Sequence, residues 1–337
     1  MKPLIILAAI LVTAPASATS PTWEELSSHL FTNAVIIWQA PTNNLPKIFW
    51  VYQRTLPHVF SATIISNAIV LGSLQRKGFP QPSTNDFYIS EDKGPNPMAS
   101  IPTIFGIRPS DASMYYSIPN YSAGSGKEIP NDEMIVRRAR KYASQLGLDP
   151  ATLVQKNIYT HICNRDQNGK TTNLVCGRGV LLSRQLDGIT FFSADNEGED
   201  AEGFSIEFGS FGQIRSFSFR WSNVTRYKNS PTASRQQIIQ CIQAHKTLVL
   251  PNIGEDDYFA RLTKLASAKK LTINKITPYY GEGILGEVPT NDVPCKFATP
   301  FAELEAIANF GNSNLTIRLI SPIISSEVIR LLGNNPK

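Results

Sequence analysis

The sequence predicts an α+β fold in which helices pack on antiparallel sheets. In a few segments apolar residues recur at helical spacing, as Ile135, Ala139 and Tyr142 do, and this spacing is typical of a helix with one buried face. In many other segments apolar and polar residues alternate, which indicates strands with one buried face. Helical and strand-like segments come in separate runs, as they do in α+β proteins. A helix followed by strands occurs more than once, so the chain has room for two helix-plus-sheet units.

The composition is that of a folded protein with no marked preference for nucleic acid. Of the 337 residues, 42% are hydrophobic and 18% are charged, which excludes a wholly disordered chain. The formal net charge is only +5, and the basic residues are dispersed. A nucleic-acid partner is therefore not expected.

The first 18 residues are typical of a cleaved export signal. Lys2 supplies a positive start, residues 4–12 are apolar, and Ala16-Ser17-Ala18 has the small-residue pattern that a signal peptidase cleaves behind. The apolar run is shorter than the ~20 residues that span a bilayer. We therefore expect a soluble mature protein in the periplasm or outside the cell, without an integral membrane segment.

Residues 19–120 are predicted to form an aromatic-rich α+β segment. Ser61 has the side chain of a favoured helix N-cap, and Gly78 that of a helix stop. The elements expected here are a helix over 62–77, a Pro-rich loop over 80–97, strands at 101–107 and 114–118, and a linker over 117–130.

Residues 131–335 are predicted to form a second α+β region. Asn131 or Asp132 is expected to cap a helix that Gly147 ends, and Asp187-Gly188 is a tight-turn signal between strands. The other elements expected here are strands at 153–163, 174–184, 189–192, 204–208, 213–221, 271–276 and 315–319, helices at 230–245, 255–267, 299–310 and 326–332, and a bend at 279–283.

Residues 132–221 resemble the extracytoplasmic PepSY-like regulatory domains and the related YycI-type accessory proteins. Three segments carry the resemblance: the helix end Gln145-Leu146-Gly147, the strand and turn at 180–189, and the strands at 204–221. The resemblance implies a helix on an antiparallel sheet, in a PepSY- or cystatin-like arrangement. It also implies a role in binding or restraining a partner without catalysis. These domains have no catalytic residues, so none is carried over.

Four cysteines are expected to form disulfides in an exported protein. A turn-rich segment separates Cys163 from Cys176, and a hairpin centred between residues 169 and 170 would place these two directly opposite each other. Such a bond would stabilise the fold by about 3 kcal/mol. Cys241 and Cys295 are then left to pair with each other.

Two metal sites are alternatives, one to the disulfides and one to a solvated acidic loop. His161 and Cys163 on one strand face, with Cys241 and His245 on one helix face, would supply the ligands of a zinc site. Against it, the tight CxxC spacing is missing, and His245 falls in an apolar helix stripe. The acidic cluster of Asp195, Glu197, Glu199, Asp200 and Glu202 could hold calcium, with the first three as ligands, but a solvated loop explains it more simply. We expect neither a metal nor another cofactor.

No motif in the sequence specifies a reaction. The chain has only four histidines, and it lacks both G-x-S-x-G and H-E-x-x-H. The leading hypothesis is an exported, non-catalytic protein that binds or regulates an extracytoplasmic protein or peptide partner. The alternatives are a secreted hydrolase with an active site assembled across the two halves of the chain, and a structural protein of the envelope or matrix.

Overall fold

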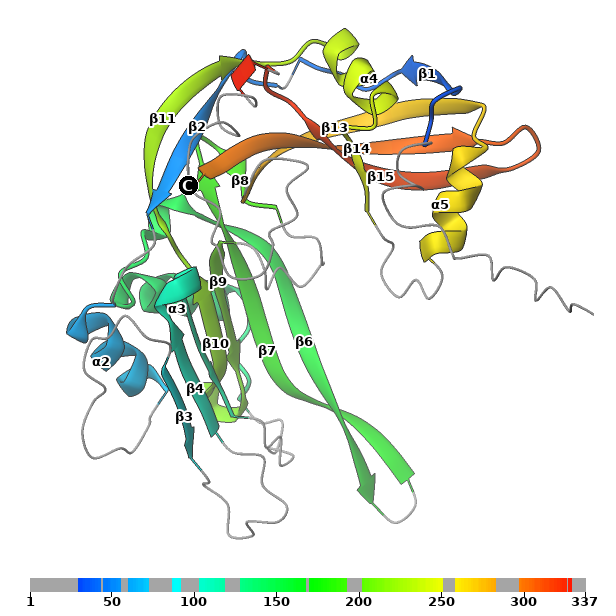
Figure 1. The fold of residues 1–337 in the computed structure, drawn as a ribbon. Coiled ribbons are helices and arrows are strands. Elements are labelled where there is room, and N and C mark those ends of the chain that lie inside the picture. Colours follow the sequence, from blue (N-terminus) through cyan, green and yellow to red (C-terminus); the bar gives the residue numbers. More distant parts are fainter. Residues whose placement is uncertain are drawn as a thin grey trace, which may run out of the picture.

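The computed structural model describes eleven stretches of the chain, which form two β-sheets and four helices (Figure 1). The predicted α+β class is confirmed, with one antiparallel and one mixed sheet. The predicted export signal, the Gly-rich centre of the 117–130 linker and most of the 326–332 helix lie outside these stretches. The described residues are 30–43, 45–55, 60–72, 87–91, 103–118, 128–167, 170–192, 202–250, 258–282, 297–325 and 327–328.

One sheet has eight strands, and every pair in it is antiparallel. In spatial order its strands are β3 (Phe87–Glu91), β4 (Thr103–Arg108), β5 (Ser113–Ser117), β10 (Ile214–Arg220), β9 (Gly203–Phe208), β7 (Lys170–Leu186) and β6 (Leu153–Gln167), with β8 (Ile189–Thr190) paired to the end of β7. The turn between β7 and β8 has positive φ at Asp187 and Gly188, as the predicted tight turn requires.

Two helices, α2 (Ala62–Leu71) and α3 (Asp132–Gln145), pack with this sheet around one apolar core. The side chains of Ser61 and Asn131 accept hydrogen bonds from the first turns of these helices, so both predicted caps are confirmed. The end of α3 at Gly147 is confirmed as well, because Gly147 has a φ of 80° directly after the helix. By contrast, α2 ends at Gly72, before the predicted stop at Gly78.

The other sheet has seven strands and is mixed, because its first strand runs parallel to its neighbour. Its strands are β1 (Val35–Trp38), β2 (Ile48–Thr55), β11 (Asn223–Pro231), β12 (Leu248–Val249), β13 (Lys270–Glu282), β14 (Phe297–Asn309) and β15 (Asn314–Pro322). The helices α4 (Arg235–Gln243) and α5 (Tyr258–Ala266) bury apolar side chains in the core of this sheet.

The predicted helix at 299–310 is wrong, since these residues belong to the central strand β14. β14 is paired with β13 along one edge and β15 along the other. Its first eight residues are all buried, so the apolar and polar alternation of a half-buried strand is absent. Ala, Leu and Glu give the segment a high helix propensity, which the pairing on both sides overrides.

Three further assignments are corrected. Residues 87–91 form strand β3 inside the predicted 80–97 loop, because they pair with β4. Residues 230 and 231, the predicted start of a helix, are the end of β11 (Asn223–Pro231), and α4 begins only after its cap at Ser234. The predicted bend at 279–283 is the end of β13, which stays paired with β14 up to Glu282.

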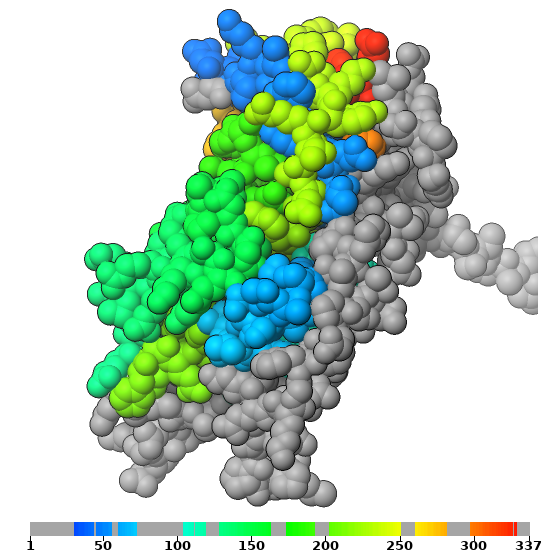
Figure 2. All heavy atoms as spheres, turned by 90° about the vertical axis from the view of Figure 1, so that its left-hand side faces the viewer, coloured from blue at the N-terminus to red at the C-terminus, as the bar shows by residue number. Residues whose placement is uncertain are grey.

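The chain passes from the seven-stranded sheet to the eight-stranded sheet after β2 and returns after β10. Each sheet therefore contains strands from both sides of the predicted 117–130 linker. Figure 2 shows the blue N-terminal segment beside yellow-green residues at the top of the molecule, in agreement with the pairing of β2 with β11. Among the described residues, no helix is long and apolar enough to cross a bilayer.

Candidate functional site

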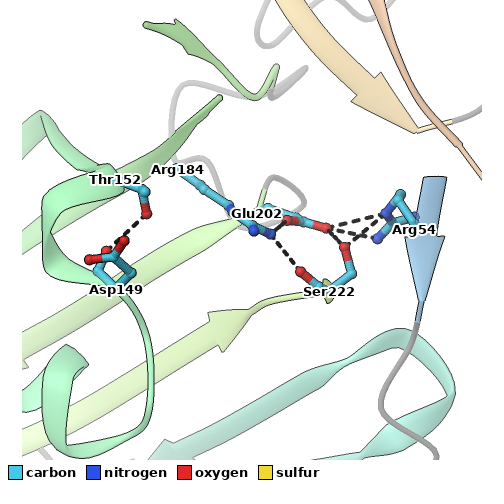
Figure 3. Close-up of polar contacts among 6 residues, drawn as sticks. All are labelled: Arg54, Asp149, Thr152, Arg184, Glu202 and Ser222. Atoms are coloured by element: carbon cyan, nitrogen blue, oxygen red, sulfur yellow. Dashed lines mark hydrogen bonds and ion pairs between the residues drawn. The ribbon is translucent and has the colours of Figure 1, made fainter. Parts of the chain in front are cut away.

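A buried ion-pair network joins the two sheets (Figure 3). Glu202, directly before β9, has no exposed surface, and Arg54 reaches it from β2 of the other sheet. The Nη2 and Nε atoms of Arg54 donate to Glu202 Oε1 at 3.0 and 3.2 Å. The sequence grouped Glu202 with an exposed acidic loop, but the fold buries its carboxylate between arginines.

Arg184 and Ser222 complete this network. Arg184 Nη1 on β7 pairs with the second carboxylate oxygen of Glu202 and donates to the backbone oxygen of Ser222 at 2.7 Å. The Ser222 hydroxyl donates to Glu202 as well. The Arg184 guanidinium lies 4.1 Å from the centre of the Trp221 ring, a contact that favours a desolvated cation. We refer to Arg54, Arg184, Glu202 and Ser222 as the junction network.

A second cluster lies at the same junction and is partly open to solvent. The Tyr52 hydroxyl on β2 donates to Asp187, and Arg226 Nη2 on β11 donates to the other oxygen of Asp187 at 2.6 Å. Burial and the hydrogen bond to Asp187 raise the pKa of Tyr52 to about 12, although Arg226 acts in the opposite direction. This cluster fixes the β7–β8 turn against the seven-stranded sheet.

The contacts of the junction network suit a structural role, in which buried charges hold the two sheets together. Glu202 cannot reach a substrate, because its side chain has no exposed surface. Each of its two oxygens pairs with an arginine, Oε1 with Arg54 and Oε2 with Arg184. Removal of one partner from such a buried pair is costly, since it leaves the other charge uncompensated. We therefore interpret the junction network as the element that fixes the orientation of the two sheets.

The β6–β7 hairpin extends beyond the other strands of its sheet, as Figure 1 shows. The pairing of β7 with β9 ends at Arg178, whereas the hairpin itself continues to Gln167 and Lys170. We call residues 160–167 and 170–177 the arm. Ile162 and Val175 face each other across the arm and are 57% and 40% exposed. These two side chains form a small apolar surface that is open to solvent on the projecting hairpin.

A buried carboxylate lies at the base of the arm. Glu207 on β9 is buried, and its Oε1 lies 4.0 Å from His161 Nδ1 on β6 and from Arg215 Nη1 on β10. Burial raises the pKa of Glu207, while the positive charges of His161 and Arg215 lower it by less. His161, a predicted zinc ligand, thus lies beside a carboxylate.

One pocket, of about 290 Å³, lies between residues 42–47 and the start of α4. Its polar lining includes Lys47, Thr232 and Arg235. Two backbone N–H groups at the start of α4, those of Ser234 and Gln237, are already engaged there, because these residues form a capping box.

The cysteines only partly follow the prediction. Gln167 pairs with Lys170, so the hairpin is centred one residue earlier than expected, and Leu174 lies opposite Cys163. Cys176 is the extra residue of a bulge in β7 and belongs to a disulfide. Its partner sulfur is not among the described side chains, so its pairing with Cys163 stays a prediction. Cys241 carries a free thiol here, which does not agree with its predicted bond to Cys295, a residue outside the described stretches.

The structure does not bring the zinc candidates together. His161 lies on β6 of the eight-stranded sheet, whereas Cys241 and His245 belong to α4 and its end on the other sheet. Within the described stretches, no three His, Cys, Asp or Glu residues are placed to share a metal ion. The calcium candidates Asp195, Glu197 and Glu199 lie outside these stretches.

Comparisons with known proteins assign no family. No protein-family model matches the chain, and no curated protein matches its sequence. Its fold is similar to the crystal structure of an uncharacterized protein from Eubacterium rectale ATCC 33656, with 10% sequence identity and a TM-score of 0.44. This similarity covers 87% of the present chain and 88% of the other. At this level it carries no functional argument.

Proposed function

We propose that the chain is an exported, non-catalytic protein that binds or regulates a protein or peptide partner through the arm. The observation that carries this proposal is the exposed Ile162–Val175 pair on the projecting hairpin. Burial of such a pair by a partner removes apolar surface from water, which favours association. The junction network supports this role, since it anchors the end of β7, one of the two strands of the arm, to the seven-stranded sheet.

The resemblance to PepSY-like domains supports the same proposal. It implied a helix packed on an antiparallel sheet over residues 132–221. In the structure, α3 packs on the antiparallel strands of this region. Membership of the PepSY or YycI families is part of the proposal.

The proposal is tested by affinity capture from the exported protein fraction of the producing cells. The baits are the unaltered chain, Ile162→Asp, and Val70→Asp as the matched control. Val70 is also an exposed apolar residue, at 70%, but it lies on α2 and away from the arm. We expect a partner that the unaltered chain and Val70→Asp retain and that Ile162→Asp loses.

Two results would contradict the proposal. One is a set of captured proteins that is the same for all three baits. The other is capture no greater than that of an unrelated bait. Unchanged circular dichroism spectra of both variants would show that a loss of binding does not come from unfolding.

A further inference from the structure

One oxygen of the carboxylate at the base of the arm is buried without a hydrogen-bond partner among the described residues. Glu207 Oε1 has no hydrogen-bond partner among the described residues, and its two closest cationic atoms are 4.0 Å away. A buried charge in this setting is costly unless it is neutralised or the site opens to water. The position of Glu207 therefore makes the state of its proton important for the local fold.

Glycine at position 177 leaves space for this carboxylate. A Cβ atom at Gly177 would lie 2.3 Å from Glu207 Oε1, so the carboxylate occupies the space that a side chain at this point of β7 would need. Arg215 Nη1, on β10, donates to the backbone oxygen of Cys176 at 2.7 Å. Glu207 thus lies where both strands of the arm meet the rest of the sheet.

The groups that face Glu207 define its electrostatic surroundings. β6 contributes His161 and also Tyr159, which is in register with Gly179 and Glu207 and whose ring covers Gly179. β10 contributes Arg215, and β7 contributes glycines at 177 and 179, which carry no charge. The effect of burial outweighs the two cations, so the protonated form of Glu207 is favoured in the closed structure relative to open chain.

We propose that Glu207 is a proton-controlled latch at the base of the arm. With its carboxyl group protonated, β6 and β7 stay closed on β9 and β10. When the proton leaves to solvent, the base opens more often, because opening lets water reach the carboxylate. This goes beyond the proposed binding role, and its test does not depend on any partner.

The sign of the pH dependence follows from linkage. The pKa of Glu207 is higher in the closed state than in the open state, so stability of the closed base is complete at acid pH. It is lost as the pH rises from the ordinary glutamate range through the raised pKa. Each unit of pKa difference corresponds to a tenfold change in the opening equilibrium.

The test is hydrogen–deuterium exchange of the backbone amides at the base of the arm, residues 157–162 and 174–179, between about pH 4 and 8. After correction for intrinsic exchange rates, we expect opening of the unaltered protein to increase at least several-fold with pH. Glu207→Gln is neutral at every pH, so its base should open no more at pH 8 than at pH 4. Glu305→Gln is the matched control, since Glu305 lies on β14 in an exposed ion pair with Lys275, and it should follow the unaltered protein.

A second variant tests the same latch independently. His161→Gln removes a positive charge that favours the ionised carboxylate, so the pKa of Glu207 in the closed state should rise further. In this variant, opening of the base should therefore increase over a wider pH range and reach a higher level than in the unaltered protein. The proposal is overturned if Glu207→Gln keeps the pH profile of the unaltered protein, or if opening in the unaltered protein is flat or decreases with pH.

Discussion

Neutralisation of Glu202 should destabilise the whole protein strongly. The substitution Glu202→Gln keeps the size of the side chain but removes the only carboxylate between Arg54 and Arg184 in the junction network. The side chains of these arginines are 1% and 7% exposed, so water cannot replace the lost charge. Loss of one member of a buried ion pair costs about 3–5 kcal/mol.

This cost can be measured by thermal unfolding. For a chain of this size, each kcal/mol lowers the melting temperature by about 2–4 °C, so Glu202→Gln should lower it by about 10 °C. Glu305→Gln breaks an exposed ion pair on β14, which is worth about 0–1 kcal/mol, and should change the melting temperature by less than about 4 °C. The interpretation of the junction as a structural joint is refuted if the two substitutions have equal effects.

Two further predictions follow from local geometry. Ultraviolet titration of the unaltered protein should show one tyrosine that ionises near pH 12 and that is missing from Tyr52→Phe. Because an unfolded tyrosine ionises near pH 10, the folded state should lose stability as the pH rises from about 10 to about 12. A Tyr52 that ionises with the exposed tyrosines would contradict its burial against Asp187. Asn131→Ala should lower the free energy of unfolding by about 1 kcal/mol, since it removes the cap of α3; urea unfolding would detect this, and no change would show that the cap is dispensable.

Local chemistry made parts of the fold predictable. Asn131 and Gly147 mark the two ends of α3, and Asp187-Gly188 marks a turn, because each depends on the backbone preferences of the residue itself. Strand β14 could not be predicted in this way. Its residues are good helix formers, and only its pairing with β13 on one edge and β15 on the other makes it a strand.

The junction network was missed for a related reason. Arg54 and Glu202 are 148 residues apart, and no local pattern connects them. A signal was present, however, since both Arg54 and Arg184 interrupt strand segments that are otherwise rich in apolar residues. A charged residue at such a position needs a buried partner. The sequence identifies this need but not the partner.

Site-specific photo-cross-linking in the producing cells tests the role of the arm most directly. A photoreactive phenylalanine analogue would replace Val175 on the arm or, as a control, Val70 on α2. We predict that irradiation joins the chain to a discrete partner from position 175 and not from position 70. Equal products from both positions, or none from position 175, would contradict the proposal that the arm is the contact surface.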